Sequence, residues 1–407
     1  MSCKASAVRA ALLLILLAST CVPLRAQEPG APTNGAPEIW LVTYGPGDIY
    51  WQRFGHNAIW VRDPTLGLDH TFNFGFFDFN QDDFFLRFLQ GRMLYFSAAR
   101  PASEEFAGYI DENRSIRAQR LALSADRAMD LAAHLLDEVR PANRDYLYDY
   151  YTNNCSTRVR DALDLALGGT LQRQFGGTIA PQSWRDHTRR LTAADFWLYL
   201  GLETVLGAPV DRPIDRWEEM FIPAVLADAA AGVFVGPGGV ITAEAAAGAL
   251  PLVQEDVTLF ASTLPPPPAA PQTWWPRYLL VSFGIVAAVW LLTRRGPVWL
   301  APLLARSWLG LGGVAGLAML FFWFGTDHAV ASLNLNLLVF SPLWLWPTGF
   351  RSAAGRTTPL VGSLSALALV MPFLPPWQYS FDVLAAFLPL NLAAAVVVDR
   401  HRRPGRR

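Results

Sequence analysis

The chain has 407 residues, which is enough for two or three domains. Hydrophobic residues make up 52% and charged residues 16%, a balance typical of a protein that lies partly in lipid. The formal net charge of −1 conceals a division, because residues 27–277 carry a net charge of about −11 and residues 278–407 about +7. An acidic first part argues against a polyanionic partner, so we expect no binding to nucleic acid.

Residues 1–26 have the pattern of a secretory signal peptide. Lys4 and Arg9 form a basic start, and the apolar run from Ala10 to Ala18 is too short to span a bilayer. Leu24-Arg25-Ala26 supplies a cleavage site with a small residue at its end. The pattern therefore predicts export of the following domain.

The positions of the three cysteines matter for the predicted signal peptide and for its cleavage. A lipoprotein signal ending at Cys21 is the alternative, although Thr20 is larger than the residue that normally precedes such a cysteine. Cleavage after Ala26 would remove Cys3 and Cys21, and Cys155 would then have no disulfide partner within the chain. A solitary thiol in an oxidising compartment favours a chemical role for Cys155.

Residues 27–262 are predicted to form an external domain of the α+β class. Strands are expected where aromatic and β-branched residues cluster between turn signals, over 39–43, 57–61, 71–78 and 116–123. Helices are expected where apolar residues recur at helical spacing, over 84–91, 103–111, 124–140, 155–167, 193–206 and 214–231. A compact sheet with helices packed on it is the architecture that this order favours.

Residues 263–277 read as a proline-rich linker that ends in an interfacial anchor, Trp274-Trp275-Pro276-Arg277. An all-α bundle of about five transmembrane helices is predicted over residues 278–398. The expected spans are Tyr278–Leu292, Trp308–Gly325, Ala331–Trp346, Pro359–Leu374 and Phe381–Val398.

The arginines fix the predicted orientation of these spans. With the first domain outside, the inner loops carry Arg294, Arg295, Arg306, Arg351 and Arg356, and residues 399–407 form a basic cytoplasmic tail. The outer connections, 326–330 and 375–380, carry no lysine or arginine. This distribution obeys the positive-inside rule and agrees with the signal peptide.

Cys155 lies where a thiol would be reactive. Asparagine is a preferred N-cap residue, so the pair Asn153-Asn154 predicts that Cys155 lies in the first turn of a helix. The positive end of the helix dipole there favours a thiolate with a lowered pKa. Asn154, Ser156 and Thr157 are the candidates for oxyanion stabilisation or positioning. The alternative is a buried cysteine that acts only as a small apolar side chain.

His56 is the candidate base for this thiol. It follows Gly55 and opens a predicted strand, where an imidazole can approach a substrate. Asn73 or Asp78 on the neighbouring strand could orient the ring, and Asn73 is preferred because it lies inside the strand. This thiol–imidazole chemistry uses no metal and no cofactor.

Polar residues in the membrane part form a second group of candidates. Asn334 and Asn336 lie in the outer half of a predicted span, where they either bind a neighbouring helix or face a substrate. His328, beside Asp327, could contact a lipid headgroup, assist a proton transfer, or have no role beyond the interface. All these residues lie on the predicted outer side of the membrane, the side of the linker.

Three segments resemble a known family: PGDIYWQRFGHNAIWVRD (46–63), FNFGFFDF (72–79) and YDYYTNNCSTRVRDAL (148–163). They look like the external domain of Lnb-type lipoprotein acyltransferases, over roughly residues 38–230. The layout is similar to the circularly permuted, NlpC-type papain-like fold, in which histidine precedes cysteine, as in lecithin:retinol acyltransferase. The resemblance implies Cys155 as nucleophile and His56 as base, in a protein of the bacterial inner membrane with a periplasmic domain.

The function that these observations predict is a membrane-bound acyltransferase with a thioester intermediate and a lipid or lipoprotein substrate. Transfer of the acyl group to water would make the protein a lipid hydrolase instead. Two further alternatives remain: a cell-wall peptidase or amidase, which would be active without the spans, and a membrane scaffold without catalysis, which would tolerate loss of Cys155 and His56.

Overall fold

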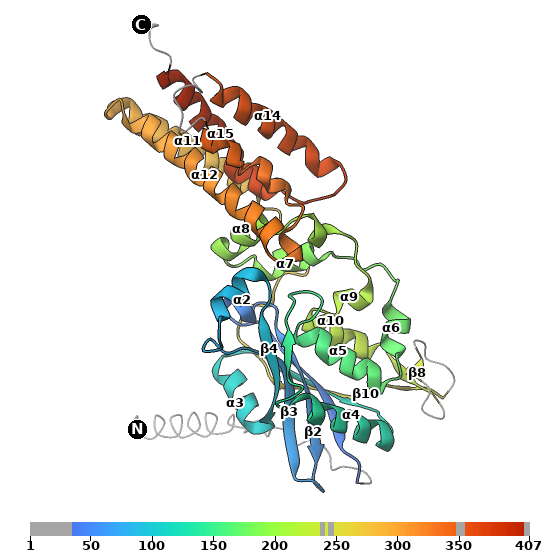
Figure 1. Ribbon diagram of the computed structural model, residues 1–407. Coiled ribbons are helices and arrows are strands. Elements are labelled where there is room, and N and C mark those ends of the chain that lie inside the picture. Colours follow the sequence, from blue (N-terminus) through green and yellow to red (C-terminus); the bar gives the residue numbers. More distant parts are fainter. Residues whose placement is uncertain (1–34, 237–240, 243–247, 347–354, 403–407) are drawn as a thin grey trace, which may run out of the picture. The chain divides into compact units, whose positions relative to one another are not determined.

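The computed structural model describes residues 35–236, 241–242, 248–346 and 355–402. Its first part is built on a seven-stranded antiparallel sheet, in the order β10-β5-β1-β2-β3-β4-β6 (Figure 1). The strands are β1 (Glu38–Tyr44), β2 (His56–Asp63), β3 (Leu68–Phe76), β4 (Leu94–Pro101), β5 (Ile116–Leu121), β6 (Asp145–Leu147) and β10 (Val253–Phe260). A small second sheet pairs β7 (Phe234–Val235) with β8 (Ile241–Thr242) and β9 (Leu250–Pro251).

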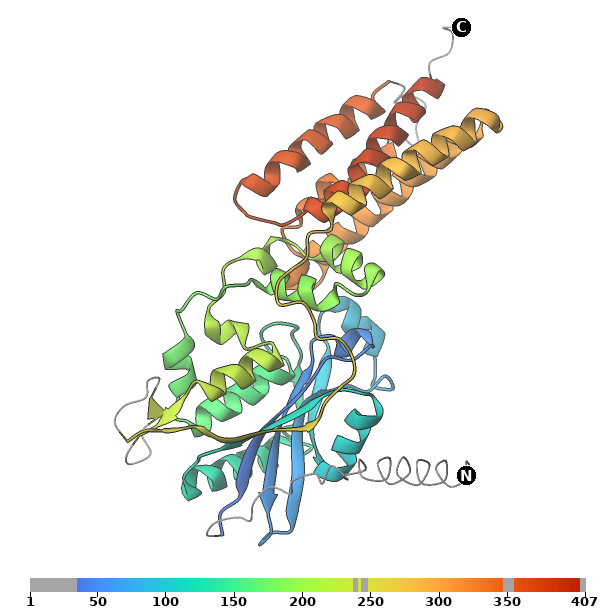
Figure 2. The same cartoon turned by 180° about the vertical axis from the view of Figure 1, so that it is seen from behind.

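Both faces of the central strands are buried. In β1, Ile39 and Leu41 belong to one apolar cluster, whereas Trp40 and Val42 belong to another, because successive side chains point to opposite faces. The first cluster is covered by α4 (Ala125–Glu138), α5 (Cys155–Ala166) and α10 (Pro223–Ala231). The second is covered by α3 (Ala102–Asp111), and Figure 2 shows the sheet between these two layers.

Shorter helices complete the first part of the chain: η1 (Tyr50–Gln52), α2 (Phe84–Gln90), α6 (Thr170–Phe175), α7 (Trp184–Thr192), α8 (Phe196–Val205), η2 (Ala208–Asp211) and α9 (Arg216–Glu219). Buried charges join three of these helices, since Arg185 of α7 lies 3.4 Å from Glu203 of α8 and 2.8 Å from Asp211 of η2. The hydroxyl of Tyr199 donates to Asp382 at 2.6 Å, which ties α8 to the membrane part.

The predicted class, an α+β domain followed by a helical region, is confirmed. Each of the four predicted strands and the predicted helices up to Ala166 are present. The expected helix over 214–231 is instead two helices, α9 and α10, because Pro223 opens a new helix with Ile222 as its N-cap. The predicted helix over 193–206 begins only at Phe196, since the side chain of Asp195 caps α8.

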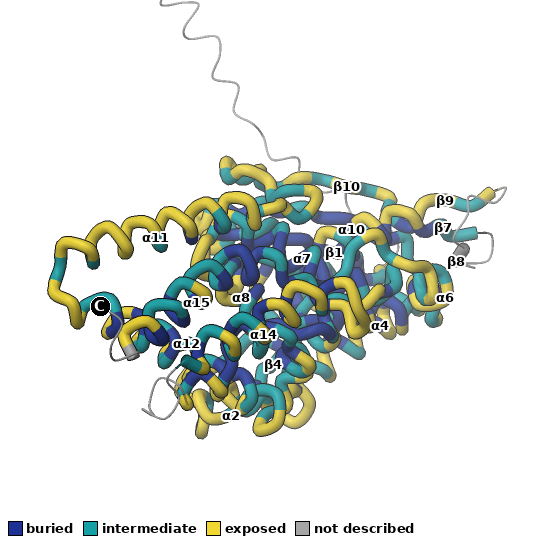
Figure 3. The backbone as a smooth tube through the Cα atoms, turned by 90° about the horizontal axis from the view of Figure 1, so that it is seen from above, coloured by how far each residue is buried: buried dark blue, intermediate teal, exposed yellow. Residues whose placement is uncertain are grey.

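Three helices are long and apolar enough to cross a membrane: α11 (Trp275–Arg295), α12 (Leu300–Gly325) and α15 (Phe381–Arg402). They correspond to the first, second and fifth predicted spans. In Figure 3, α11 is mostly exposed, as expected of a lipid-facing helix, although Tyr278 and Ser282 on it are buried.

The other two predicted spans form shorter elements. Instead of one helix, residues 331–346 contain the short turns η5 (Leu335–Leu338) and η6 (Pro342–Trp344), preceded by η4 (Ala329–Ala331). The side chains of Asn334 and Ser341 each cap the start of a short turn, so the segment is divided into separate turns. The fourth span is α14 (Thr357–Val370) followed by η8 (Met371–Phe373), with Pro372 inside η8.

The predicted linker is described over its whole length and lies along the first part of the chain. Gln182 donates to the carbonyl of Ala269 at 2.8 Å, and Arg189 donates to that of Gln272 at 2.8 Å. Its last residues, from Trp275, already belong to α11. The predicted signal peptide, Cys3, Cys21, Arg351 and residues 403–407 of the predicted tail lie outside the described residues.

Candidate active site

Cys155 is the first residue of α5, as predicted. Asn154 is the N-cap: its Oδ1 accepts from the backbone N–H of Thr157 at 2.9 Å, and its own N–H donates to the hydroxyl of Thr157 at 2.8 Å. Nδ2 of Asn154 also donates to the carbonyls of Tyr150 and Phe221, each at 3.0 Å. These side chains hold the helix start in place, so Asn154 and Thr157 are positioned to orient Cys155.

Ser156 ties the helix start to the strand that carries His56. Its hydroxyl lies 2.9 Å from Oδ1 of Asn57 and 2.7 Å from the carbonyl of Met220. Backbone N–H groups of Asn57 and Ser156 also hydrogen-bond to the thiol of Cys155. The sulfur therefore lies against the residue that follows His56, and the fold brings together two positions that are 99 apart in the sequence.

His56 is oriented by Asn73. Nε2 of His56 lies 2.9 Å from Oδ1 of Asn73, and Nδ2 of Asn73 donates to Oε2 of Glu105 at 2.6 Å. Because Nδ2 is committed to the carboxylate, Oδ1 is the acceptor and Nε2 must carry the imidazole proton. Nδ1 is left with a free lone pair, which is what a base needs. Asp78, the other candidate, accepts from the backbone of Asn80 in a turn instead.

Glu105 is the residue that the sequence analysis missed. It is buried in the first turn of α3 and accepts from three groups: Asn73, the hydroxyl of Thr71 at 2.7 Å and the hydroxyl of Tyr44. Burial raises its pKa, although the three donors oppose that effect. Glutamates are common in the first turn of a helix because the helix dipole favours negative charge there, so no local signal distinguishes Glu105 from the others.

The thiol and the imidazole are both uncharged at neutral pH. Burial raises the pKa of Cys155 to about 11, against the backbone donors of Asn57 and Ser156 that lower it. Burial also lowers the pKa of His56 to about 4, with the positive charge of Arg114 acting in the same direction. The expected lowering of the thiol pKa was therefore wrong, because desolvation outweighs the helix start. Within the described residues, no hydrogen bond joins the two groups.

Aromatic side chains enclose this pair. The ring of His56 stacks on those of Tyr44 and Tyr109, with centroids 5.9 and 6.3 Å away. A Cβ on Gly75 would lie 3.5 Å from that of Cys155 and 4.0 Å from the ring of Tyr148. Burial raises the pKa of Tyr148 well above its ordinary value, so its hydroxyl stays protonated. The surroundings of the thiol are thus largely apolar.

The three membrane-side candidates lie elsewhere. Asn334 donates to the carbonyls of Thr204 and Val205, at 3.0 and 2.9 Å, and Asn336 donates to that of Glu203 at 2.9 Å. Both are buried, and both satisfy the last carbonyls of α8, which is the inter-helix contact given above as one alternative. Nε2 of His328 lies 2.9 Å from the carbonyl oxygen of Phe88 in α2.

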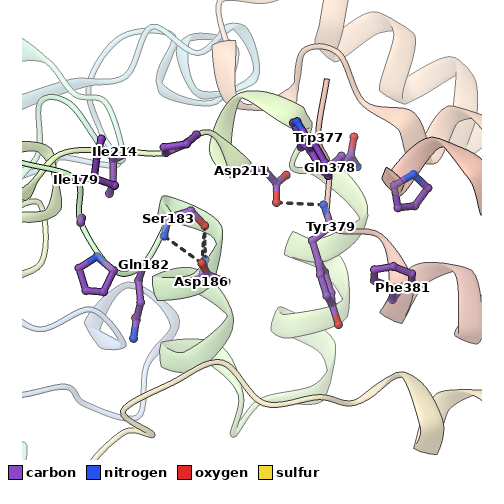
Figure 4. Close-up of a pocket in the computed structure, with 14 residues that line it drawn as sticks. Ile179, Gln182, Ser183, Asp186, Asp211, Ile214, Trp377, Gln378, Tyr379 and Phe381 are labelled. Atoms are coloured by element: carbon purple, nitrogen blue, oxygen red, sulfur yellow. Dashed lines mark hydrogen bonds between the residues drawn. The ribbon is translucent and has the colours of Figure 1, made fainter. Parts of the chain in front are cut away.

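Two cavities lie away from these residues. Figure 4 shows a pocket of about 460 Å³, in which Asp211 accepts from the backbone N–H of Tyr379 at 3.1 Å and Ser183 faces Asp186. A larger cavity of about 1150 Å³ is lined by apolar residues of α8, α11, α12 and α15. Neither is lined by Cys155, His56 or Asn73, so both are separate from the candidate active site.

The fold and these contacts define a membrane-associated protein whose mixed α/β domain holds a half-buried cysteine at a helix start. Residues 35–190 match the model of the family described as the Lnb N-terminal periplasmic domain. The match contains His56, Asn73 and Cys155, and it confirms the resemblance stated above. Neither a search of curated proteins nor a search of solved structures gives a match.

Proposed function

We propose that the protein is a membrane-bound acyltransferase that forms a thioester on Cys155 and moves an acyl chain within or between lipid-modified substrates. The proposed acceptor is a free amino group of a lipoprotein. The proposed location is the bacterial inner membrane, with several spans and with the first domain in the periplasm. The family of the domain and the three membrane-length helices support this location.

In the first half of the proposed reaction, the sulfur of Cys155 attacks the carbonyl carbon of an acyl ester while its proton passes to Nδ1 of His56. Backbone N–H groups at the helix start take the negative charge on the carbonyl oxygen. The ester C–O bond then breaks, and the leaving alcohol takes the proton from His56. This leaves a thioester on Cys155 and a neutral imidazole.

In the second half, an amine nitrogen attacks the thioester carbonyl and gives one proton to Nδ1 of His56. The C–S bond breaks, and the sulfur recovers that proton. Because both groups rest uncharged, His56 works as a general base during attack rather than as the partner of a preformed thiolate. The apolar surroundings of the thiol favour a long acyl chain over a peptide.

One observation carries the proposal. The hydrogen bonds from Glu105 through Asn73 leave Nδ1 of His56 free to accept a proton, and the residue after His56 on β2 contacts the helix start that carries Cys155. A thiol that served only for packing would need no oriented imidazole nearby. The same pair could serve a hydrolase, in which water replaces the amine.

The test is the intact mass of the full-length protein purified from native membranes, wild type beside Cys155→Ala, with and without neutral hydroxylamine. We expect a fatty-acyl adduct that hydroxylamine removes and that only the wild type carries. An adduct of the same mass on Cys155→Ala would rule out the thioester. Release of free fatty acid from a lipid substrate, with no transfer to an added lipopeptide amine, would identify a hydrolase.

A further inference from the structure

Helix α2 is a surface helix with an apolar sequence, Phe-Phe-Leu-Arg-Phe-Leu-Gln. None of its residues is buried, and Phe85 is 75% exposed. Leu86, Phe88 and Leu89 are each at least 40% exposed. A surface helix normally hides its apolar stripe against the core, so a helix that exposes it indicates a contact with another phase or partner.

The exposed apolar surface extends beyond α2. Trp51 of η1 and Phe79, at 60% and 58% exposure, join it through ring contacts with the half-buried Phe77 and Phe84. The ring of Phe77 lies 6.2 Å from Trp51 and 4.9 Å from Phe79, which in turn lies 5.0 Å from Phe84. We call Trp51, Phe79, Phe85, Leu86, Phe88 and Leu89 the aromatic patch.

The aromatic patch is bonded to the end of a membrane-length helix. The backbone N–H of Asp327 donates to the carbonyl of Gln90 at 2.8 Å, and Nε of Arg92 lies 2.5 Å from the carboxylate of Asp327. His328 donates to the carbonyl of Phe88. The approach is close enough that a Cβ on Gly91, whose φ is +77°, would lie 2.8 Å from the nitrogen of His328.

These contacts set the depth of the patch. α12 ends at Gly325, two residues before Asp327, so the point at which the helix leaves the bilayer lies beside α2. Aromatic and aliphatic side chains at that level enter the boundary between headgroups and acyl chains. Arg87, on the same segment, can pair with lipid phosphates.

Aromatic rings also connect the patch with the thiol. His328 stacks on Tyr150 at 6.2 Å, and Tyr150 lies 6.1 Å from Tyr148. Tyr148 and Cys155 both lie around Gly75, 4.0 and 3.5 Å from the position of its absent Cβ. An acyl chain lifted from the bilayer along α2 would therefore meet aromatic surface up to the sulfur.

We propose that the aromatic patch is a membrane-insertion surface that enters the external leaflet and contacts the acyl chains of its lipids. Delivery of a chain to Cys155 rests on the proposed acyltransferase function, whereas insertion does not. The occupant is lipid rather than a protein partner, because the contacts with Asp327 and His328 hold the patch at the end of a span.

Insertion is tested with full-length protein carrying Cys155→Ala and Phe85→Cys, labelled with a bimane fluorophore. The protein is reconstituted into phosphatidylethanolamine and phosphatidylglycerol vesicles with brominated acyl chains. We expect strong quenching by the brominated chains and weak quenching by aqueous iodide. Cys155→Ala without the second substitution gives the background from any other labelled cysteine.

Leu66→Cys in the same background is the matched control. Leu66 is 72% exposed and apolar, but it lies in the turn between β2 and β3. Its label should respond to iodide and not to brominated chains. A label at residue 85 that behaves like the one at residue 66 would overturn the proposal. Because these variants lack the thiol, the result stands apart from the catalytic proposal.

A second measurement uses the intact thiol. Phe85→Ser combined with Leu89→Ser should lower turnover of a vesicle-borne acyl substrate by about tenfold or more. The reason is that the patch then loses the free energy of transferring two apolar side chains from water into the bilayer. Leu66→Ser should leave that turnover unchanged. Equal turnover by all three proteins would argue against any role of the patch in substrate delivery.

Discussion

Nε2 of His56 is held 2.9 Å from Oδ1 of Asn73, and the amide of Asn73 is itself fixed by the carboxylate of Glu105. The direction of each hydrogen bond follows from the one before it, so the tautomer of His56 is set by a residue on α3 that contacts neither the thiol nor the imidazole. The base is thus oriented from the face of the sheet that α3 covers, whereas the helix start that carries Cys155 packs on the opposite face.

Replacement of Asn73 by Ala should reduce kcat by roughly a hundredfold, because His56 can then rotate and place its proton on either nitrogen. Substrate binding should change little, so KM should stay near its wild-type value. Steady-state kinetics on a vesicle-borne ester measures both. Asn80→Ala, in an exposed turn, is the control, and an equal loss in both variants would contradict an orienting role for Asn73.

Glu105→Gln should destabilise the domain by about 1–3 kcal/mol, since a buried amide cannot accept from all three of its present donors. The free energy of unfolding in detergent, measured with urea, reports the change. Glu104→Gln removes a charge from the neighbouring, exposed position of the same helix and should have almost no effect. If the two variants lose the same stability, the helix dipole rather than the buried network is responsible.

Stability should have an optimum between about pH 6.5 and 9 as far as His56 and Cys155 contribute. The pKa of His56 is lowered to about 4, so the unfolded chain binds the proton first and stability falls as the pH drops from 6.5 to 4. The pKa of Cys155 is raised to about 11, so the unfolded chain loses its proton first and stability falls again between pH 9 and 11.

Thermal melting across this range checks the expectation against two variants. His187, whose pKa burial also lowers, adds to the acid loss, so the share of His56 is the difference between wild type and His56→Ala. Buried tyrosines such as Tyr148, whose pKa is also raised, add to the alkaline loss, so Cys155→Ala should reduce the alkaline limb and leave the acid limb unchanged. A Cys155→Ala protein with an unchanged alkaline limb would show that the thiol does not have a raised pKa.

Asn334→Ala should lower the free energy of unfolding by about 1–3 kcal/mol, because the carbonyls of Thr204 and Val205 would lose a buried donor. Activity per folded molecule should stay close to that of the wild type, since these contacts cap a helix. The comparison needs turnover and melting temperature on the same preparation. A large fall in turnover at unchanged stability would instead place Asn334 in contact with substrate.

The orientation of the spans is testable with single cysteines in a Cys155→Ala background. Ala329→Cys, in the connection after α12, should react in intact spheroplasts with a thiol reagent that does not cross membranes. Val298→Cys, between α11 and α12 and 77% exposed, should react only after permeabilisation. The reverse pattern would contradict the arginine distribution on which the predicted topology depends.

Elements whose positions depend on neighbouring residues could be predicted from the sequence. The asparagine before Cys155 predicted the helix start, and aromatic and β-branched clusters predicted the strands that carry His56 and Asn73. The preference for Asn73 over Asp78 as the neighbour of the imidazole agrees with the hydrogen bond that the structure contains. Their catalytic roles remain predictions.

The features that could not be predicted depend on contacts between residues distant in sequence. β10 pairs with β5 across more than a hundred intervening residues, and the adjacent acidic residues Glu255 and Asp256 within it weaken the local strand signal. Glu105 acquires its three donors only when α3 packs on the sheet. The raised pKa of Cys155 reflects tertiary burial, which a helix-start argument omits. The span expected over 331–346 failed because its asparagines bind another helix.

The position of β10 has a consequence for how this domain could be exchanged between proteins. The recognisable family segment ends at residue 190, but the edge of the seven-stranded sheet is supplied by residues 253–260. A chimera joined at the end of the family segment would leave β5 with an open, aggregation-prone edge. The unit that folds is longer than the unit that sequence comparison recognises, so any functional graft must carry the chain through Phe260.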